Sequence, residues 1–289
     1  MPERLPSWFK KRMPPPGVMA EMNTLLGGLH LNTICQSALC PNIGDCFTRH
    51  TATFLILGDT CTRNCTFCAV SKGKPQAVDI REPQHVAEAV AKLGLKHVVI
   101  TSVTRDDLPD GGAGHFARTI ALLKQENPDI TVEVLVPDFE GSAEALRSVM
   151  ATRPDVLNHN IETVPRLYPE VRPMANFSRS VELLRAAKTM NSSIITKSGL
   201  MVGLGETPDE VIEAMAALRV ASCDLLTIGQ YLQPSPRHHP VVRFIPPEEF
   251  EEFARLGRNI GFRRVASAPL VRSSFDAAEL YGKMSTKNE

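Results

Sequence analysis

Short β-rich runs alternate with amphipathic stretches from residue 53 onward, and this alternation restricts the chain to few architectures. Six runs bounded by Pro, Gly or Asn have the composition of strands. They span residues 53–57, 98–102, 130–136, 156–160, 194–202 and 225–230. Between them, apolar residues recur three and four positions apart, as they do on one face of a helix. Repeated strand–helix units predict an α/β fold whose parallel strands are joined by right-handed crossovers.

Six strand–helix units fit an incomplete barrel better than a closed barrel of eight strands. We therefore predict a partial (β/α)6 TIM-like barrel over residues 51–244, with an N-terminal extension at 1–50 and a C-terminal extension at 245–289. A doubly wound open sheet produces the same linear pattern, so periodicity alone leaves the choice between barrel and open sheet unsettled.

Six of the seven cysteines lie between residues 35 and 68. They form two triplets, Cys35-x4-Cys40-x5-Cys46 and Cys61-x3-Cys65-x2-Cys68. Such close spacing lets one loop hold three irons of a four-iron, four-sulfur cluster, and it leaves the fourth iron open for another ligand. In the second triplet, an open iron beside Phe67 is the arrangement used by enzymes that chelate S-adenosylmethionine. The spacing therefore predicts metal chemistry.

Cysteines also bind zinc, form disulfides and fill cores. A structural zinc site needs four ligands, and neither triplet has a fourth cysteine or an obvious histidine partner nearby. Disulfides require an oxidising compartment, yet residues 1–20 contain Lys10 and Lys11 without an apolar segment typical of export signals. We therefore expect a cytoplasmic protein with free thiols. Cys223 lies in an apolar run and is predicted to be a small buried residue.

The charges of the chain are balanced, with 32 Lys plus Arg and 32 Asp plus Glu. No overall charge therefore favours nucleic acid or an anionic membrane surface. The sequence also lacks an uninterrupted apolar stretch of about 18 residues, the usual length of a membrane-spanning helix. We expect neither nucleic acid nor a membrane as a partner.

Polar side chains lie at nearly every predicted strand end, where ligands gather in parallel α/β folds. The first strand runs directly into residues 58–61, which places the second triplet on the first loop between strand and helix. Each polar residue alone could be a turn former or a solvated surface residue. Together they predict one polar cavity beside the cysteine loop. The candidates are Thr101, Ser102, Glu133, Asn158, Asn160, Lys197 and Gln230.

Three segments of the chain resemble the lipoyl synthase family of the radical S-adenosylmethionine superfamily, and the resemblance runs almost end to end. These segments are CQSALCPNIGDC at 35–46, GDTCTRNCTFC at 58–68 and VRSS at 271–274. Two cysteine triplets and an Arg-Ser-Ser motif rarely coincide. Asp45, Phe47 and Phe275 stand where the family often has Glu, Trp and Tyr, and none of the three is expected to be a ligand.

The resemblance implies two 4Fe–4S clusters and bound S-adenosylmethionine. The first triplet would hold an auxiliary cluster with Ser274 as its fourth protein ligand, and the second triplet would hold the cluster that binds S-adenosylmethionine. Ser274 and the second triplet would be the catalytic groups. Arg172 suits a carboxylate through its planar fork of donors. The residues assigned to S-adenosylmethionine are Phe67, Thr101, Ser102, Glu133, Asn158, Asn160, Arg172, Lys197 and Gln230.

The reaction that the resemblance implies is a radical insertion of two sulfur atoms at carbons 6 and 8 of a protein-bound octanoyl-lysine, with the auxiliary cluster consumed as the sulfur donor. These C–H bonds are unactivated, so a radical derived from the cofactor must carry the hard step. The implied substrate carrier is an octanoylated lipoyl domain, from a 2-oxoacid dehydrogenase or the glycine cleavage H protein. Further implied partners are ferredoxin or flavodoxin as the electron donor and a cluster-assembly carrier.

Two other functions stay open at the level of sequence. A biotin synthase-like or methylthiotransferase-like enzyme would share Cys61, Cys65 and Cys68, but it would not require the first triplet together with Ser274. A non-enzymatic iron–sulfur electron carrier could use two clusters, but it would not need six strand–helix units with polar strand ends.

Overall fold

The computed structural model describes residues 5–11 and 14–285, and an eight-stranded sheet lies at the centre of this described part. Residues 1–4, 12–13 and 286–289 of the two predicted extensions lie outside the described residues. The strand order is β1-β2-β5-β6-β7-β8-β9-β10. The strands are β1 (Asn32–Thr33), β2 (Thr53–Ile56), β5 (His97–Ser102), β6 (Thr131–Leu135), β7 (Val156–Asn158), β8 (Ile195–Val202), β9 (Leu225–Gln230) and β10 (Arg264–Ser267).

The prediction of an α/β fold with a mostly parallel sheet is confirmed. All six predicted strands are present, and β2, β5, β6, β7, β8 and β9 pair in parallel in chain order. The sheet also gains two strands from segments that were assigned to the extensions. Strand β1 pairs antiparallel with β2, and β10 pairs in parallel with β9. Both added strands are short, so neither produces a β-rich run that sequence patterns could identify.

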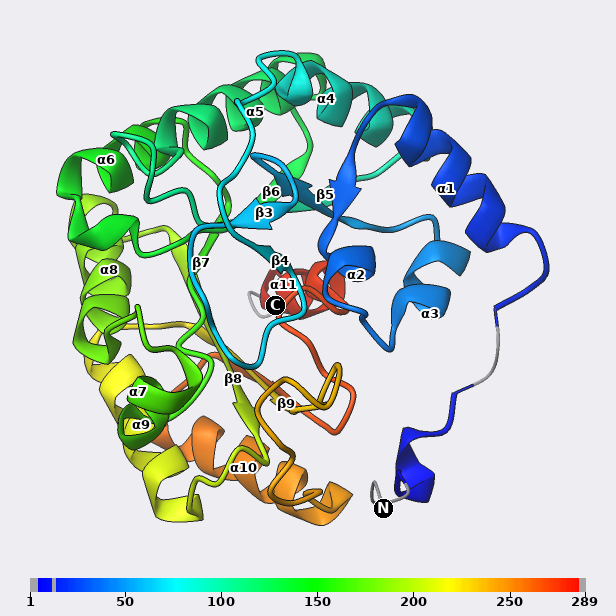
Figure 1. Ribbon diagram of the computed structural model, residues 1–289. Helices are drawn as coiled ribbons and strands as arrows, with labels where there is room; N and C mark the ends of the chain where they lie inside the picture. The colour runs from blue at the N-terminus through cyan, green and yellow to red at the C-terminus, as the bar shows by residue number, and fades with distance from the viewer. Residues whose placement is uncertain (1–4, 12–13, 286–289) are drawn as a thin grey trace.

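Helices surround the sheet, and Figure 1 shows α4, α5, α6, α8, α9 and α10 on the outside of the curved row of strands. On α4 the buried residues Val86, Ala89 and Val90 face the sheet at helical spacing. The longer helices are α1 (Val18–Gly28), α4 (Glu82–Leu93), α5 (Ala113–Glu126), α6 (Ala143–Ala151), α8 (Phe177–Met190), α9 (Pro208–Val220), α10 (Pro247–Ile260) and α11 (Ala277–Ser285). The shorter ones are α2 (Ile34–Ser37), α3 (Ile43–Thr48) and α7 (Tyr168–Val171).

The C-terminal helix α11 lies inside the ring of outer helices (Figure 1). It contacts β5 and β10, and the ring of Tyr281 lies 5.9 Å from that of His97, the first residue of β5. Since β5 and β10 run parallel to the other strands, α11 covers the end of the sheet where these strands begin. The second cysteine triplet lies beyond the opposite end, where β2 finishes. The first triplet follows β1, which runs antiparallel to β2, so it lies near the start of β2.

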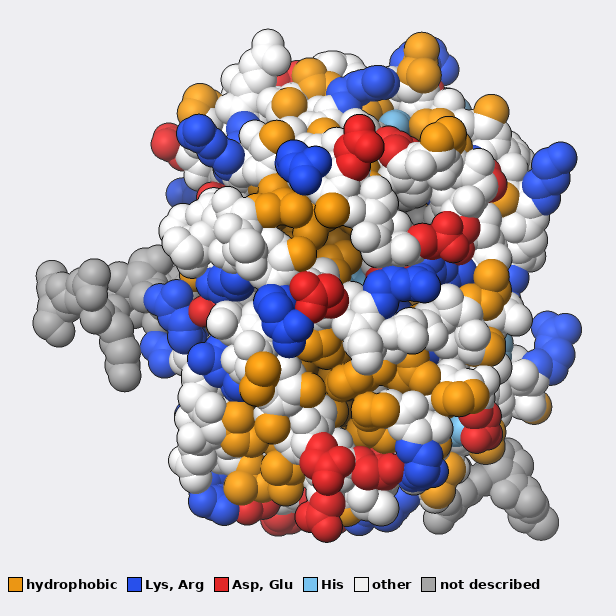
Figure 2. Space-filling model, turned by 90° about the vertical axis from the view of Figure 1, so that its left-hand side faces the viewer, with side chains coloured by type: hydrophobic (Ala, Val, Ile, Leu, Met, Phe, Trp, Pro, Cys, Tyr) orange, Lys and Arg blue, Asp and Glu red, His pale blue; other side chains and the backbone are white. Residues whose placement is uncertain are grey.

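Charges of both signs are interspersed on the face formed by α6 and α8, which Figure 2 presents. The ion pair between Arg185 and Glu182 on α8 is one example. This distribution agrees with the balanced charge of the sequence. Among the helices that the structure describes, none combines the length and the hydrophobicity needed to cross a lipid bilayer.

Candidate active site

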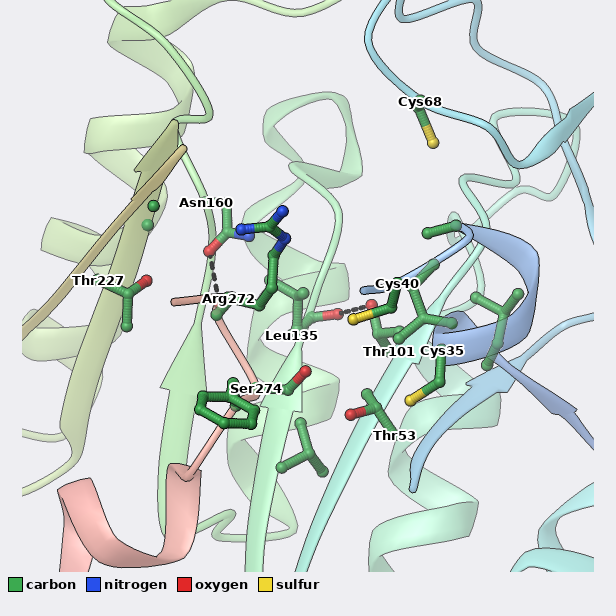
Figure 3. Close-up of a pocket in the computed structure, with 18 of the residues that line it drawn as sticks. Cys35, Cys40, Thr53, Cys68, Thr101, Leu135, Asn160, Thr227, Arg272 and Ser274 are labelled. Atoms are coloured by element: carbon green, nitrogen blue, oxygen red, sulfur yellow. Dashed lines mark hydrogen bonds between the residues drawn. The ribbon is translucent and has the colours of Figure 1, made fainter. Parts of the chain in front are cut away.

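One cavity of about 690 Å³ runs along the inside of the sheet, from the first residues of β2 and β5 (Thr53 and His97) to the loops beyond the strand ends. It brings the two cysteine triplets together with the Arg-Ser-Ser segment. Figure 3 shows the side chains of Cys35, Cys40 and Ser274 around one space, with Cys68 on another side of the cavity. The Arg-Ser-Ser segment at 272–274 is far in the sequence from both triplets at 35–68, so the fold, and not local spacing, brings it to them. All six clustered cysteines and Ser274 line the cavity, as the resemblance requires.

The loop that carries the second triplet leaves β2 through a left-handed turn. Leu57 and Gly58 have φ values of 68° and 92°, and a left-handed conformation is unfavourable for a bulky residue such as leucine. Two buried charged groups hold Leu57 in this conformation. Its N–H donates to the Glu82 carboxylate at 2.7 Å, and Arg105 donates to its carbonyl at 3.2 Å. The start of the loop is thus set by the core of the fold.

The thiols of the second triplet lie in an environment suited to an iron–sulfur cluster. The sulfur of Cys61 accepts two backbone N–H groups, from Arg63 and Thr104, each at 3.4 Å. Burial raises the pKa of Cys68 to about 12, and it also raises the pKa of Cys65 although Arg172 opposes the shift. Buried thiols of this kind lose their protons when metal binds. Hydrogen bonds to sulfur are a common means of tuning such clusters.

The first triplet lies on a compact turn that follows β1. The Thr33 side chain caps α2, which contains Cys35, and α3 contains Cys46. The N–H of Cys40 donates to the carbonyl of Cys35 at 3.0 Å, so the backbone itself folds the triplet into one loop. Burial raises the pKa of Cys35 to about 12. Burial also raises the pKa of Cys46, although the charge of Arg49 opposes the shift.

No three His, Cys, Asp or Glu side chains within the described ranges are already close enough together to hold a single metal ion. The ligand assignment therefore depends on the spacing of the triplets and on the cavity that they share. All seven cysteines are free in the structure. Cys223 is fully buried away from this cavity, as predicted.

The two serines of the Arg-Ser-Ser segment have different surroundings. The Ser273 hydroxyl accepts a hydrogen bond from Asn158 at 2.8 Å and donates to the amide oxygen of Asn160 at 2.8 Å. Within the described part of the chain, the Ser274 hydroxyl has no hydrogen-bond partner, although Ser274 lines the cavity. The Ser273 hydroxyl is therefore already used in hydrogen bonds to Asn158 and Asn160, and Ser274 is the serine whose hydroxyl can bind a further group.

Five of the residues assigned to S-adenosylmethionine line the cavity. Arg172 is buried and not on the surface, and it donates to the carbonyls of Asn160 and Ile161 at 3.1 and 3.0 Å. Its Nε and the Ser102 hydroxyl are buried without a partner in the described structure. Unpaired buried donors are costly unless a ligand completes them. The five are Phe67, Thr101, Ser102, Asn160 and Arg172.

Four of the assigned residues, Glu133, Asn158, Lys197 and Gln230, do not line the cavity. Lys197 forms a fully buried ion pair with Glu133 at 2.8 Å, and Asn158 donates to the same carboxylate at 3.1 Å. Gln230 donates to the Arg243 carbonyl and accepts from Ile245, which ties β9 to the chain beyond it. Glu133, Asn158 and Lys197 lie on the same side of the sheet as the cavity-lining Thr101 and Leu135, but their own contacts enclose them. Gln230 follows the cavity-lining Gly229 and points to the other face, because strand side chains alternate.

Two further cavity residues, His159 and Glu162, lie just beyond the end of β7 and were not among the residues predicted from the sequence. His159 donates through Nδ1 to the Val136 carbonyl, and its Nε2 has no partner among the described residues. Burial lowers the pKa of His159 to about 4, so the ring is a neutral acceptor. Glu162 also lines the cavity, and burial raises its pKa although Arg172 opposes the shift. Their adjacency to Asn158 and Asn160 was the signal available.

Comparison with known proteins gives consistent matches over nearly the whole chain. The sequence model of the Radical SAM superfamily matches residues 55–218. Lipoyl synthase from Caldanaerobacter subterraneus subsp. tengcongensis is 57% identical over 281 residues, covering 96% of this chain and 97% of that protein. Lipoyl synthase from Caldicellulosiruptor saccharolyticus is 56% identical over 279 residues, covering 96% and 98%.

Solved structures resemble the chain in fold at low sequence identity. SuiB from Streptococcus suis, bound to its precursor peptide SuiA, has a TM-score of 0.58 at 9% identity, covering 74% of this chain and 48% of that one. HydG, a maturase of the [FeFe]-hydrogenase, has a TM-score of 0.51 at 14% identity, covering 73% and 55%. These two likenesses concern the architecture of the sheet and its helices.

Proposed function

The chain belongs to the lipoyl synthase family within the radical SAM superfamily, and from this membership we propose which of its residues carry the family's reaction. The function is that of a lipoyl synthase, a radical enzyme that inserts two sulfur atoms into a protein-bound octanoyl-lysine. The observation that carries the residue assignment is the single cavity lined by both cysteine triplets and by the unpartnered Ser274.

Membership of the superfamily implies one 4Fe–4S cluster and S-adenosylmethionine. We assign this cluster to Cys61, Cys65 and Cys68, because the Cys61 sulfur already accepts two backbone N–H groups. When bound, the cluster and S-adenosylmethionine supply an electron and a radical able to remove hydrogen from an unactivated carbon. The protein's part is to bind these groups, to orient the substrate carbon and to exclude water.

Contacts to S-adenosylmethionine are proposed for the five cavity residues among those assigned from sequence, and for His159. The unpaired Nε of Arg172 and the unpaired Ser102 hydroxyl would donate to ligand oxygens. The neutral His159 Nε2 would accept a hydrogen bond from a ligand N–H. Glu133, Asn158 and Lys197 act behind the cavity wall, because their network holds Ser273. Gln230 holds the segment beyond β9.

The auxiliary cluster is the finer part of the proposal, with Cys35, Cys40, Cys46 and Ser274 as its protein ligands. The contrast between the two serines supports Ser274, since the Ser273 hydroxyl already bonds two asparagines. An alkoxide oxygen is a harder ligand than a thiolate and matches soft iron–sulfur bonding less well. Ser274 is therefore suited to be the ligand that leaves the cluster as sulfur is withdrawn.

We also propose the domain organisation in its finer form. Strands β2, β5, β6, β7, β8 and β9 would form a partial (β/α)6 barrel over residues 51–244, with outer helices and a cavity that runs along the inside of the sheet. The flanking regions 1–50 and 245–289 would carry the auxiliary site. They also add β1 and β10 to the edges of the sheet, so they are continuous with it.

The substrate is an octanoyl group on a carrier protein, and the cavity suits such a chain. Apolar side chains contribute much of its lining, including Leu39, Leu55, Val99 and Leu135. Leu39 is 66% exposed and lies in the loop between Cys35 and Cys40, where an incoming chain would pass it. The lipoyl domain of a 2-oxoacid dehydrogenase or the glycine cleavage H protein is proposed as the carrier. Ferredoxin or flavodoxin and a cluster-assembly carrier are the other proposed partners.

The test is a reconstitution without oxygen, followed by reductant, S-adenosylmethionine and an octanoyl-lysyl peptide. Peptide mass and 5'-deoxyadenosine are followed together. A gain of two sulfurs with two deoxyadenosines per product is expected. Deoxyadenosine without a gain of sulfur would indicate a different substrate, as in a biotin synthase-like enzyme. If neither product formed, the result would contradict the proposal and favour electron transfer.

A further inference from the structure

Arg49 connects the first cysteine triplet to the segment that carries Ser274. It lies three residues after Cys46, at the end of α3, and its backbone N–H donates to the Cys46 carbonyl at 3.0 Å. Its guanidinium forms an ion pair with Asp276, with 2.5 Å between Nη1 and Oδ1. The guanidinium also lies over the ring of Phe275, 5.4 Å from the ring centre. One residue thus contacts both parts of the proposed auxiliary site.

A second cation reinforces this connection from the opposite side. The Lys11 ammonium lies 5.3 Å from the centre of the Phe275 ring. Two cations, Lys11 and Arg49, are therefore close to this ring. Lys11 also donates to Asn42 and forms an ion pair with Asp45. The Asn42 side chain in turn donates to the Leu270 carbonyl at 2.7 Å. The triplet loop and residues 270–276 are therefore held together by several contacts.

Ser274 has no hydrogen bond of its own within the described structure, so its neighbours must determine where its hydroxyl points. On one side, Ser273 is anchored to the sheet through Asn158 and Asn160. On the other side, the anchor is the Asp276 carboxylate bound to Arg49. Asp276 itself has φ of 52°, a left-handed conformation that needs support from its surroundings. Loss of the Arg49 anchor would leave the Ser274 side chain free to turn away.

We propose that Arg49 is a positioning residue that sets the distance between the Cys46 sulfur and the Ser274 hydroxyl in the auxiliary site. This inference rests on the proposed function, because it takes Cys46 and Ser274 as ligands of one cluster. A guanidinium suits the role, because its plane can lie over the Phe275 ring while its N–H groups bind the Asp276 carboxylate, which the single ammonium of lysine does less well. Its positive charge also offsets the negative charge that thiolate and alkoxide ligands bring together.

The test compares reconstituted Arg49→Met and Arg49→Lys with the wild-type protein. We expect iron of the first site to be lost to a chelator about tenfold faster, because residues that orient metal ligands typically contribute tenfold or more to affinity. Backbone hydrogen exchange of residues 268–276 should also become faster in both variants. Formation of 5'-deoxyadenosine should persist while the gain of sulfur by the octanoyl peptide is lost. Asp276→Asn reaches the same contact from the other side and should behave alike.

Arg243→Met is the matched control. The Arg243–Glu249 pair is 2.7 Å long, and its side chains have the same exposed fractions as those of Arg49 and Asp276, 50% and 33%. Its side chain is outside the cavity, so iron loss and hydrogen exchange of 268–276 should match those of the wild type. The double variant Arg49→Met with Asp276→Asn should lose iron no faster than Arg49→Met alone, because Arg49→Met already removes the contact with Asp276.

Two results would overturn the inference. Wild-type iron loss and exchange in Arg49→Met and Asp276→Asn would show that Arg49 does not position Ser274. Faster iron loss with unchanged exchange of 268–276 would confine the effect to Cys46. Cys40→Ala tests the proposed auxiliary cluster itself. If two clusters are present, this variant should lose roughly half of the iron. If it retained the full iron content, the proposed auxiliary cluster would be wrong, whatever the role of Arg49.

Discussion

The two cysteine loops are held in different ways, although they face one cavity. The second loop is fastened to the core. Arg63, inside this loop, forms buried ion pairs with Asp106 and Asp138, and Thr66 donates to the Val171 carbonyl. The first loop is fastened mainly to segments near the two ends of the chain, through the half-exposed pair of Arg49 and Asp276 and the contacts of Lys11.

This difference matches the different demands that the proposed function makes on the two clusters. A cluster that only transfers an electron is best held by a rigid loop, since its ligands need not move. A cluster that supplies sulfur must be dismantled and rebuilt, so its ligands must be able to separate. Exposed ion pairs contribute little to stability and can break at small cost. Buried pairs with complete hydrogen bonds are much harder to open.

The largest expected effect comes from exchanging a cysteine in each loop for alanine. Cys65→Ala should reduce formation of 5'-deoxyadenosine to the background level, because the cluster that binds S-adenosylmethionine loses a ligand. Cys40→Ala should still form deoxyadenosine but add no sulfur to the octanoyl peptide. Both products are measured by mass spectrometry in one reaction. Equal loss of deoxyadenosine in the two variants would mean that the loops do not have separate roles.

The next effect concerns the ligand that must leave. Ser274→Cys should retain the iron of both clusters, because a thiolate also binds iron, yet sulfur insertion should slow by roughly tenfold or more since the thiolate is held more tightly. Iron content and the rate of mass gain are the measurements. Ser193→Cys, on an exposed loop, is the control for an added thiol. Undiminished full turnover of Ser274→Cys would contradict the proposed role.

A smaller effect is expected on the free energy of unfolding, and it distinguishes the buried ion pair that holds the second loop from the exposed ion pair that holds the first. Arg63→Met should lower the free energy of unfolding by about 3 kcal/mol, because it leaves the buried Asp138 carboxylate without its main partner. Arg49→Met removes the half-exposed pair with Asp276 that holds the first loop and should cost less than about 1 kcal/mol. Urea unfolding of the metal-free, reduced chains measures both. Similar losses in the two variants would remove the distinction between the loops.

The smallest expected effect is a dependence of stability on acid. Burial by itself would raise the pKa of Asp138, but the hydrogen bond and charge of Arg63 lower it from 3.8 to about 2. A carboxyl with a lowered pKa stabilises the fold above its unfolded value, and this stability is lost as pH falls from about 4 to about 2. The loss should be about 2 kcal/mol. Urea unfolding between pH 2 and 5 should show it, and Asp138→Asn should flatten this part of the curve.

The cysteine spacing and the strand–helix alternation were read correctly from the sequence because both are local. Three thiols within eight residues stay close together in any fold, and a period of two or of three to four residues reports one element at a time. The six parallel strands followed from this, with the second triplet directly after the first of them. The added strands β1 and β10 were missed, since each has a partner distant in sequence and little pattern of its own.

The sequence by itself thus determined the α/β class, the two triplets and the strand ends around the cavity. Only the tertiary structure decided which polar strand residues face that cavity, turning Glu133 and Lys197 into a buried pair while leaving Arg172 and His159 at the wall. It also decided that the Ser273 hydroxyl forms hydrogen bonds with Asn158 and Asn160, whereas the Ser274 hydroxyl does not. The physical reason is that side-chain partners separated by 64 residues, as in Glu133 and Lys197, or by 115, as in Asn158 and Ser273, are chosen by packing of the whole chain, which no local pattern encodes.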